Sequence, residues 1–373
     1  MLLSPLAGEH NVSRTPKNES TLRKVIAQMF SPLFSILLIP FIIAMFLAIN
    51  MGGSGTAPSF SAAYGANIMK RELIPGVFGI FVFIGAILAG KKVVLTVGSG
   101  IIPADMMGLT LTTIILLSVS ISLLLANLLR IPQSTSQSTV FALIAPAILF
   151  KNLNAHKLFV EIIPAWFVLP LISFVISYVI GRFIYKPIKD KEIVNFEQLS
   201  THPVLKFLVI ATSLYVAFAI GSNNVANAAG PLAAMMSTNL HIHPDDSRFL
   251  LLMIASTLII APCFGIGSSI FGHRVVETIG KNIIDFSPLG ASLISFITAS
   301  LLLLASVSRG IPTSLVQMNT AAIIGLGISK VGYKQILART TVKKLFTIWI
   351  IVPIISFLLS LLLTIIAYRS NIL

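Results

Sequence analysis

The chain has 373 residues, of which 56% are hydrophobic and only 10% charged, and its mean hydropathy is +0.96. Soluble domains carry about 25% charged residues, so a water-soluble fold is excluded, and at roughly 20 apolar residues per crossing the chain has room for about ten membrane helices. The 26 Lys and Arg exceed the 12 Asp and Glu by a net charge of +14, which we assign to loops that face anionic lipid rather than to nucleic-acid binding. The composition predicts an all-α polytopic membrane protein.

Along the chain, a polar segment, residues 1–27, precedes the first apolar run, and we expect it to be a flexible tail. The first apolar run extends from Phe30 to Ile49 and is long enough to span a membrane. Further runs lie near residues 73–90, 107–129, 138–150, 158–185, 204–222, 248–272, 287–308, 320–329 and 345–368. The runs at 138–150 and 320–329 are too short to span alone and follow segments of Pro and hydroxyl residues. They predict re-entrant or broken helices, because polar backbone at membrane depth must face protein or water.

The two halves of the chain repeat each other. GKKVVLTVGSGII from Gly90 is similar to GHRVVETIGKNII from Gly272, and RIPQSTSQ from Arg130 is similar to GIPTSLVQ from Gly310. A weaker pair joins GGSGTAPS and GSNNVANA, which begin at Gly52 and Gly221. Repeats whose apolar segments are interrupted at corresponding positions are typical of a secondary transporter, and a channel of tandem halves is the alternative.

The hydrophilic segment 186–203 predicts a linker between a first repeat, 28–185, and a second, 204–373. With about five membrane segments in each half, the two repeats have inverted topology and the loops alternate between two sides. The linker side then carries 15 of the 26 Lys and Arg, so we expect the linker in the cytoplasm and both termini outside.

Neutral polar residues cluster at the ends of the predicted broken helices. A proline at a helix start leaves free backbone N–H groups, and the positive end of the helix dipole then faces the site. Two such ends from opposite halves would form an anion site, although Asn and Ser in membrane helices also serve only to tie helices together. The candidate substrate-binding residues are Ser54, Ser134, Thr135, Ser136, Gln137, Asn223, Asn224, Asn227, Thr313, Ser314 and Gln317.

Carboxylates are missing from all of these polar segments. A cationic substrate would need a negative partner at membrane depth, so their absence favours an anion. Glu161 is the candidate for proton coupling, whereas Glu277 lies near Arg274 and Lys281 and is better interpreted as a surface ion pair.

The remaining chemistry-bearing residues do not indicate an enzyme or a cofactor. No Ser, His and Asp set or carboxylate pair shares a plausible site, and the single cysteine, Cys263, lies in an apolar stretch. His241 and His243 precede Asp245 and Asp246 and could bind a metal, but a solvated loop is the simpler interpretation, so we expect no metal site.

GSNNVANAAGP resembles the motif GANDVANAFG of the inorganic phosphate transporter family, and the two Ile-Pro segments resemble its PVSTTH motif. The resemblance spans nearly all of residues 30–370. Asn224 stands where the family has Asp, and Ser54 and Gly55 replace the motif Asn and Asp in the first half. Gln137 and Gln317 occupy the position of the family's His.

These neutral replacements resemble the sulfate permease branch of the family, which implies import of sulfate or a related tetrahedral oxyanion across the plasma membrane. Sulfate only accepts hydrogen bonds, so neutral donors suit it and a carboxylate would repel it. Loss of the motif Asp residues argues against sodium coupling and leaves proton symport as the expectation. Phosphate symport is the alternative, and a homodimer is left open.

Overall fold

The computed structural model describes residues 32–129, 133–187, 202–243, 246–272, 287–338 and 340–373. The chain forms two compact units, Met1–Ile39 and Pro40–Leu373, and the second contains all the described helices except the first turns of α2. Every regular element in these ranges is helical, which confirms the predicted all-α class.

The first half holds α2 (Pro32–Gly65), η1 (Arg71–Leu73), α3 (Ile74–Ala89), α4 (Lys91–Leu95), η2 (Thr96–Gly100), η3 (Ala104–Met106), α5 (Leu109–Leu128), α6 (Thr135–Leu149), η4 (Lys157–Ile162), α7 (Ile163–Ile180) and η5 (Gly181–Tyr185). The second half holds α10 (Pro203–Asn224), α11 (Ala226–Asn239), α12 (Ser247–Gly267), η6 (Ser268–Gly272), α14 (Pro288–Arg309), α15 (Leu315–Val331), α16 (Tyr333–Leu337) and α17 (Thr340–Arg369). The segments η2, η4, η5 and η6 are π-helical turns joined directly to α4, α7 and α12.

The lengths of the helices match the predicted membrane segments. Within the described ranges, eight continuous helical stretches are long and apolar enough to cross a membrane. The two shorter apolar helices are α6 and α15, which lie where the sequence predicts re-entrant helices. The predicted tail and most of the predicted linker fall outside the described residues, so the repeat boundaries stay predictions.

The two polar motifs that begin at Gly52 and Gly221 both lie in long helical stretches, and they differ in their effect on the helix. The motif in the second half leaves one residue, Val225, between α10, which ends at Asn224, and α11, which begins at Ala226, and the Val225 backbone stays in the right-handed helical region. In the first half, by contrast, α2 continues past the predicted end at Ile49, with Pro58 inside it. The hydroxyls of Thr56 and Ser59 donate to the carbonyl oxygens of Gly52 and Gly55, at 2.7 and 3.0 Å. Pro58 lacks the N–H that would bond to the Ser54 carbonyl, and these two hydroxyls bond to other carbonyls of the same helical turns.

Helices of one half pack on helices of the other, and the contacts recur at matching positions. Helix α7 packs on α15, and α17 packs on α6. Ser173 of α7 donates its hydroxyl to the Met318 carbonyl oxygen at 2.9 Å, and Ser356 of α17 donates to the Ser138 carbonyl oxygen, also at 2.9 Å. Met318 lies 180 residues after Ser138, which is the spacing between the two Ile-Pro motifs.

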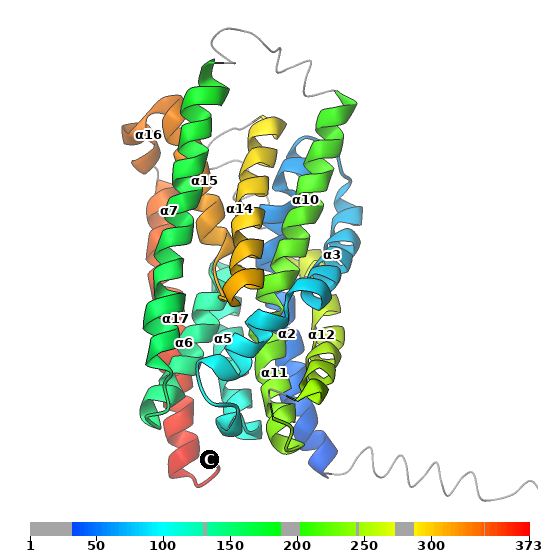
Figure 1. Cartoon of the computed structure of the whole chain (residues 1–373), viewed down its shortest axis with the longest axis vertical. Helices are drawn as coiled ribbons and strands as arrows, with labels where there is room; N and C mark the ends of the chain where they lie inside the picture. Colours follow the sequence, from blue (N-terminus) through cyan, green and yellow to red (C-terminus); the bar gives the residue numbers. More distant parts are fainter. Residues whose placement is uncertain (1–31, 130–132, 188–201, 244–245, 273–286, 339) are drawn as a thin grey trace, which may run out of the picture. The chain divides into compact units, whose positions relative to one another are not determined.

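Two glycines permit a second pair of matching contacts. A Cβ at Gly52 would overlap the backbone of Phe264 in α12, and a Cβ at Gly221 would overlap the backbone of Val82 in α3. Close approach of this kind is the usual function of small residues between membrane helices. In Figure 1, α7 and α17 run in opposite directions along the vertical axis. These pairs agree with two equivalent halves, and their inversion across the membrane stays a prediction.

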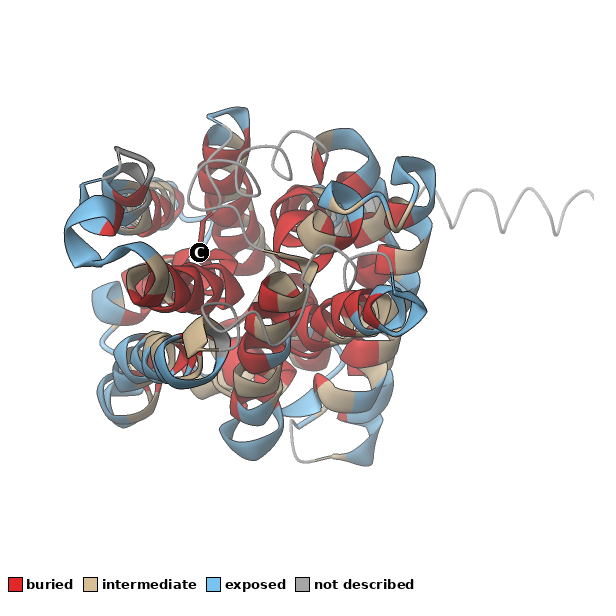
Figure 2. Ribbon diagram, turned by 90° about the horizontal axis from the view of Figure 1, so that it is seen from above, coloured by how far each residue is buried: buried red, intermediate tan, exposed pale blue. Residues whose placement is uncertain are grey.

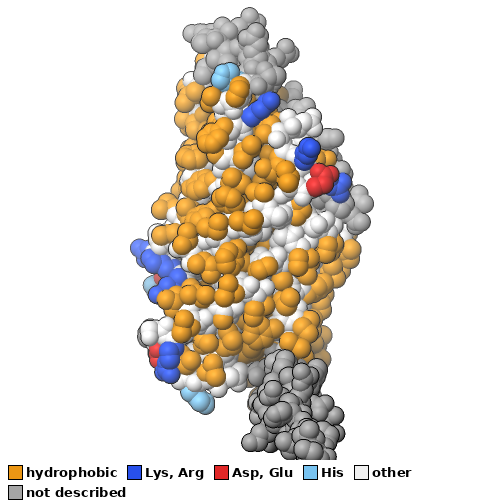
Figure 3. Space-filling model, turned by 90° about the vertical axis from the view of Figure 1, so that its right-hand side faces the viewer, with side chains coloured by type: hydrophobic (Ala, Val, Ile, Leu, Met, Phe, Trp, Pro, Cys, Tyr) orange, Lys and Arg blue, Asp and Glu red, His pale blue; other side chains and the backbone are white. Residues whose placement is uncertain are grey.

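The outside of the Pro40–Leu373 unit is apolar. Buried residues lie on the inward-facing sides of the helices, and exposed residues lie on their outer sides (Figure 2). Large side chains such as Leu88, Phe167 and Phe207 are exposed, and hydrophobic atoms cover most of the face in Figure 3. Such a surface suits contact with lipid, while polar groups are placed inside.

Candidate functional site

Two helix N-termini are built in the same way. Ser134 precedes α6, and its Oγ accepts a hydrogen bond from the Gln137 backbone N–H at 3.2 Å. Ser314 precedes α15, and its Oγ accepts from the Gln317 backbone N–H at 3.3 Å. Each serine caps its helix and satisfies one of the free backbone donors of the first turn. The Ile-Pro-x-Ser pattern therefore places two helix starts where the sequence predicts them.

The first turns of α6 and α15 are joined by a reciprocal pair of amides. Gln137 Nε2 donates to Gln317 Oε1 at 3.1 Å, and Gln317 Nε2 donates to Gln137 Oε1 at 2.8 Å. Both side chains are buried. Each amide therefore donates one hydrogen bond to the other and accepts one from it. This contact joins the two helix N-termini.

Asn223, at the end of α10, connects both motifs. Its Nδ2 donates to Ser306 Oγ at 2.8 Å and to the Ile311 carbonyl oxygen at 2.9 Å. Its Oδ1 accepts from the Thr313 backbone N–H at 3.1 Å and from Ser136 Oγ at 3.4 Å. The side chain is fully buried, and each of its polar atoms has two partners. Asn223 therefore fixes the tip of the α14–α15 hairpin against α6.

Asn227 holds the start of α6 from α11. Its Nδ2 donates to Thr135 Oγ1 at 3.3 Å and to Ser136 Oγ at 3.2 Å. Its Oδ1 is buried and has no hydrogen-bond partner among the described residues. Trp166 of α7 adds a further contact, since its Nε1 donates to the Pro312 carbonyl oxygen at 2.9 Å.

A small cavity lies between these elements. Its volume is about 10 Å³, which is close to the minimum for one water molecule. None of the side chains that line it is charged, within the described part of the chain. The polar residues that line it are Ser54, Gln133, Thr135, Asn224, Thr313 and Ser314.

The predicted site residues lie together around this cavity. Of the eleven candidates, five line it, and the others form the two caps and the hydrogen bonds beside it. Their role in substrate binding stays a prediction. The sequence reasoning missed Gln133, although it lies inside the RIPQSTSQ motif directly before the capping serine. It also missed Ser306 and Trp166, which no local pattern distinguishes from other residues of apolar helices.

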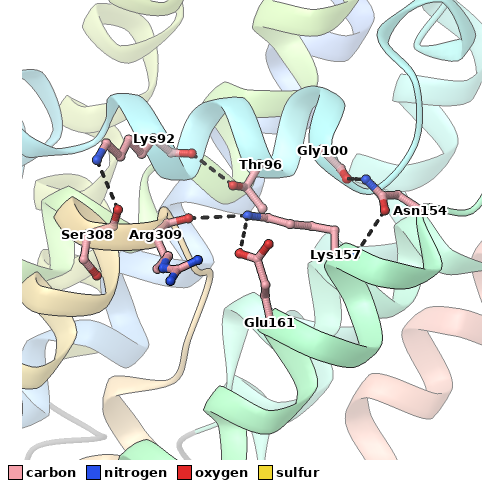
Figure 4. Close-up of polar contacts among 8 residues, drawn as sticks. All are labelled: Lys92, Thr96, Gly100, Asn154, Lys157, Glu161, Ser308 and Arg309. Atoms are coloured by element: carbon pink, nitrogen blue, oxygen red, sulfur yellow. Dashed lines mark hydrogen bonds and ion pairs between the residues drawn. The ribbon is translucent and has the colours of Figure 1, made fainter.

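Glu161 lies apart from the cavity, in a charged cluster shown in Figure 4. Its Oε2 is 2.7 Å from Lys157 Nζ, one helical turn earlier. Lys157 Nζ also donates to the Arg309 carbonyl oxygen at 3.5 Å, and Lys92 Nζ donates to the Ser308 carbonyl oxygen at 3.1 Å. The carbonyls of Ser308 and Arg309 lie at the C-terminus of α14, which is the negative end of the helix dipole, so they favour contact with lysine ammonium groups. The role of Glu161 in proton coupling stays a prediction.

Asp246, one of the four residues named above as a possible metal site, makes contacts of a different kind. Asp246 accepts hydrogen bonds from the Arg248 backbone N–H at 2.8 Å and from its Nη2 at 2.6 Å, and so caps α12. The Arg248 guanidinium lowers the pKa of Asp246 to about 2. Asp245 and Glu277 lie outside the described residues. Among the described residues, no three His, Cys, Asp or Glu side chains form a metal-binding group.

The chain matches the phosphate transporter family over residues 51–360. It is 33% identical over 322 residues to the sulfate permease CysP of Bacillus subtilis (strain 168), covering 86% of this chain and 85% of that protein. It is 25% identical over 203 residues to the probable low-affinity inorganic phosphate transporter of the same organism, covering 53% of this chain and 57% of that protein.

A solved structure described as the sodium-dependent phosphate transporter has the same fold. The TM-score is 0.75 at 22% identity, over 90% of this chain and 99% of that chain. The match to the family, the relatives and the apolar helices together identify a multi-pass membrane protein that transports anions. The chain belongs to the phosphate transporter family.

Proposed function

We propose that this protein imports sulfate, or a related tetrahedral oxyanion, across the plasma membrane by alternating access and in symport with protons. The observation that carries the proposal is the cavity between the N-termini of α6 and α15, lined by neutral polar side chains. Helix N-termini favour an anion through their free N–H groups and their dipoles. A fully ionised oxyanion gains these donors without facing a carboxylate.

The size of the cavity supports alternating access. A space of about 10 Å³ admits about one water molecule and is too small for a tetrahedral oxyanion. Substrate therefore enters in another conformation, in which the N-termini of α6 and α15 have moved apart. The amide pair of Gln137 and Gln317 joins the two helix starts and is the contact that such a movement must break.

Phosphate is the second candidate substrate, and one feature of the site favours it. The Oδ1 atoms of Asn224 and Asn227 are buried acceptors without partners among the described residues. Hydrogenphosphate has an O–H group that can donate a hydrogen bond to such an oxygen, whereas sulfate has none. Because an amide exchanges its oxygen and nitrogen by turning about its last bond, Asn224 also serves as a donor to sulfate.

Counterflow in proteoliposomes tests the substrate and the coupling ion. Vesicles loaded with unlabelled sulfate are supplied outside with labelled sulfate or labelled phosphate, with an inward proton gradient or with sodium. Accumulation of sulfate alone, stimulated by the proton gradient, is the expected result. Accumulation of phosphate alone would overturn the sulfate proposal, stimulation by sodium alone would overturn proton symport, and currents without counterflow would indicate a channel.

We also propose inverted repeats with the linker, residues 186–203, in the cytoplasm and both termini outside. Cys263 is the single cysteine, so Cys263→Ser provides a background for site-specific labelling. Lys70→Cys, in the loop after α2, should react only with reagent on the cytoplasmic side. Asn152→Cys, in the loop after α6, should react only from outside, and the reverse pattern would overturn the orientation.

A further inference from the structure

Gln133 and Thr313 occupy equivalent places before α6 and α15. Each directly precedes the serine that caps its helix, Ser134 for α6 and Ser314 for α15. They are separated by 180 residues, as are Gln137 and Gln317. Each is 1% exposed, and both line the same cavity.

These two residues differ from their neighbours in their hydrogen bonds. Gln133 Nε2 and Oε1 and Thr313 Oγ1 are buried and have no hydrogen-bond partner among the described residues. Ser134, Ser314 and the two paired glutamines one turn further on all have partners. Buried polar groups in folded proteins are nearly always paired, so unpaired atoms on one cavity indicate a function outside folding.

We propose that Gln133 and Thr313 bind the transported oxyanion directly and determine which oxyanion the site prefers. This inference rests on the proposed function. To a fully ionised oxyanion, Gln133 donates through Nε2 and Thr313 through its hydroxyl. To a protonated oxyanion, Gln133 Oε1 or Thr313 Oγ1 accepts. The remaining oxyanion oxygens face the free N–H groups at the start of α6 and α15.

Replacing the two side chains by apolar ones of similar shape separates binding from folding. Gln133→Met and Thr313→Val remove polar atoms that have no hydrogen-bond partner among the described residues, so neither leaves a new unpaired group there. The substrate-free variants should unfold at the wild-type temperature or higher. A structural role would instead lower the unfolding temperature.

The test measures sulfate counterflow kinetics and thermal unfolding with and without sulfate. We expect each variant to raise the KM for sulfate at least about tenfold and to lose the stabilisation by sulfate, because each hydrogen bond to a charged group is lost. Thr313→Ser keeps the hydroxyl and should stay near wild type. Thr298→Val is the matched control, since Thr298 is equally buried and, in the part of the chain that the structure describes, its hydroxyl bonds only within α14.

Gln133→Glu tests the choice between oxyanions. A carboxylate at this position repels a fully ionised oxyanion and accepts from a protonated one. We expect this variant to lose sulfate transport and to gain phosphate uptake relative to sulfate, more at pH 6 than at pH 8.

A KM for sulfate within twofold of wild type in both Gln133→Met and Thr313→Val would overturn the inference and leave the proposed function standing. If wild type transports phosphate in place of sulfate, the sulfate proposal fails, and the same variants measured with phosphate test the inference. If the wild-type protein neither transports sulfate or phosphate nor is stabilised by them, both the proposed function and this inference are overturned.

Discussion

The C-terminus of α14 and the N-terminus of α15 are close in sequence but differ in the charge of the side chains around them, and helix polarity explains the difference. At the C-terminus of α14, the carbonyls of Ser308 and Arg309 are contacted by Lys92 and Lys157. A few residues later, at the N-terminus of α15, the cavity is lined by neutral side chains. A helix C-terminus favours cations and an N-terminus favours anions, so the two lysines bind away from the cavity at which we propose that the anion binds.

Gly310 makes this abrupt reversal feasible. It caps α14 in the left-handed conformation, with φ of 63°, and a side chain there would meet the Lys92 carbonyl group. Glycine adopts this conformation without steric cost. The charged end and the neutral end of the hairpin are therefore separated by only a short turn.

The largest effect is expected where Asn223 fixes the neutral end. Asn223→Leu leaves the Ile311 carbonyl and the Thr313 N–H without their partner. At about 1–3 kcal/mol for each of these two buried groups, the loss is about 2–6 kcal/mol, seen as a lower unfolding temperature. Asn239→Leu is the control, because among the described residues Asn239 bonds only to the Met235 carbonyl oxygen one turn away. Equal stability of the two variants would contradict the assigned role of Asn223.

A smaller loss is expected for the amide pair. Gln137→Leu leaves the Gln317 amide buried and unpaired, at a cost of about 1–3 kcal/mol, and Gln317→Leu does the same in reverse. The double variant leaves no amide unpaired, so it should be more stable than either single variant. A double-mutant cycle on unfolding temperatures measures this coupling, and additive losses would show that the two amides do not act together.

Glu161→Gln tests the charged end and should change stability by less than about 1 kcal/mol, since both partners of its ion pair are partly exposed. If Glu161 carries the coupled proton, its ion pair with Lys157 must break during the transport cycle. The variant should then lose accumulation driven by a proton gradient and retain counterflow. Glu72→Gln, an exposed position, is the control. Intact proton-driven accumulation in Glu161→Gln would remove Glu161 from the coupling mechanism.

Apolar periodicity and motif spacing predicted most of the fold and the residues around the cavity. Runs long enough to cross a membrane became α3, α5, α7 and the other spans, and the two Ile-Pro-x-Ser segments became capped helix starts. The continuation of α2 through Gly52 was not predictable from composition, because the small and polar residues from Gly52 onward and Pro58 favour a break in the helix. The missing partners of Gln133 follow from three-dimensional packing, which no local pattern records.

The smallest effect concerns a third helix terminus, the start of α12, where the anion is supplied by the protein itself. The Arg248 guanidinium and backbone N–H hold the pKa of Asp246 at about 2, below the value of about 3.9 in an unfolded chain. Because the folded-state pKa is the lower one, the stabilisation is complete above about pH 4 and is lost as the pH falls toward 2. The unfolding temperature of wild type should therefore exceed that of Asp246→Asn by a constant margin from pH 8 to 5, and the margin should shrink below pH 4. A margin that is independent of pH down to 2.5 would mean that the carboxylate caps α12 through its shape alone, and that charge at a helix N-terminus contributes nothing measurable in this protein.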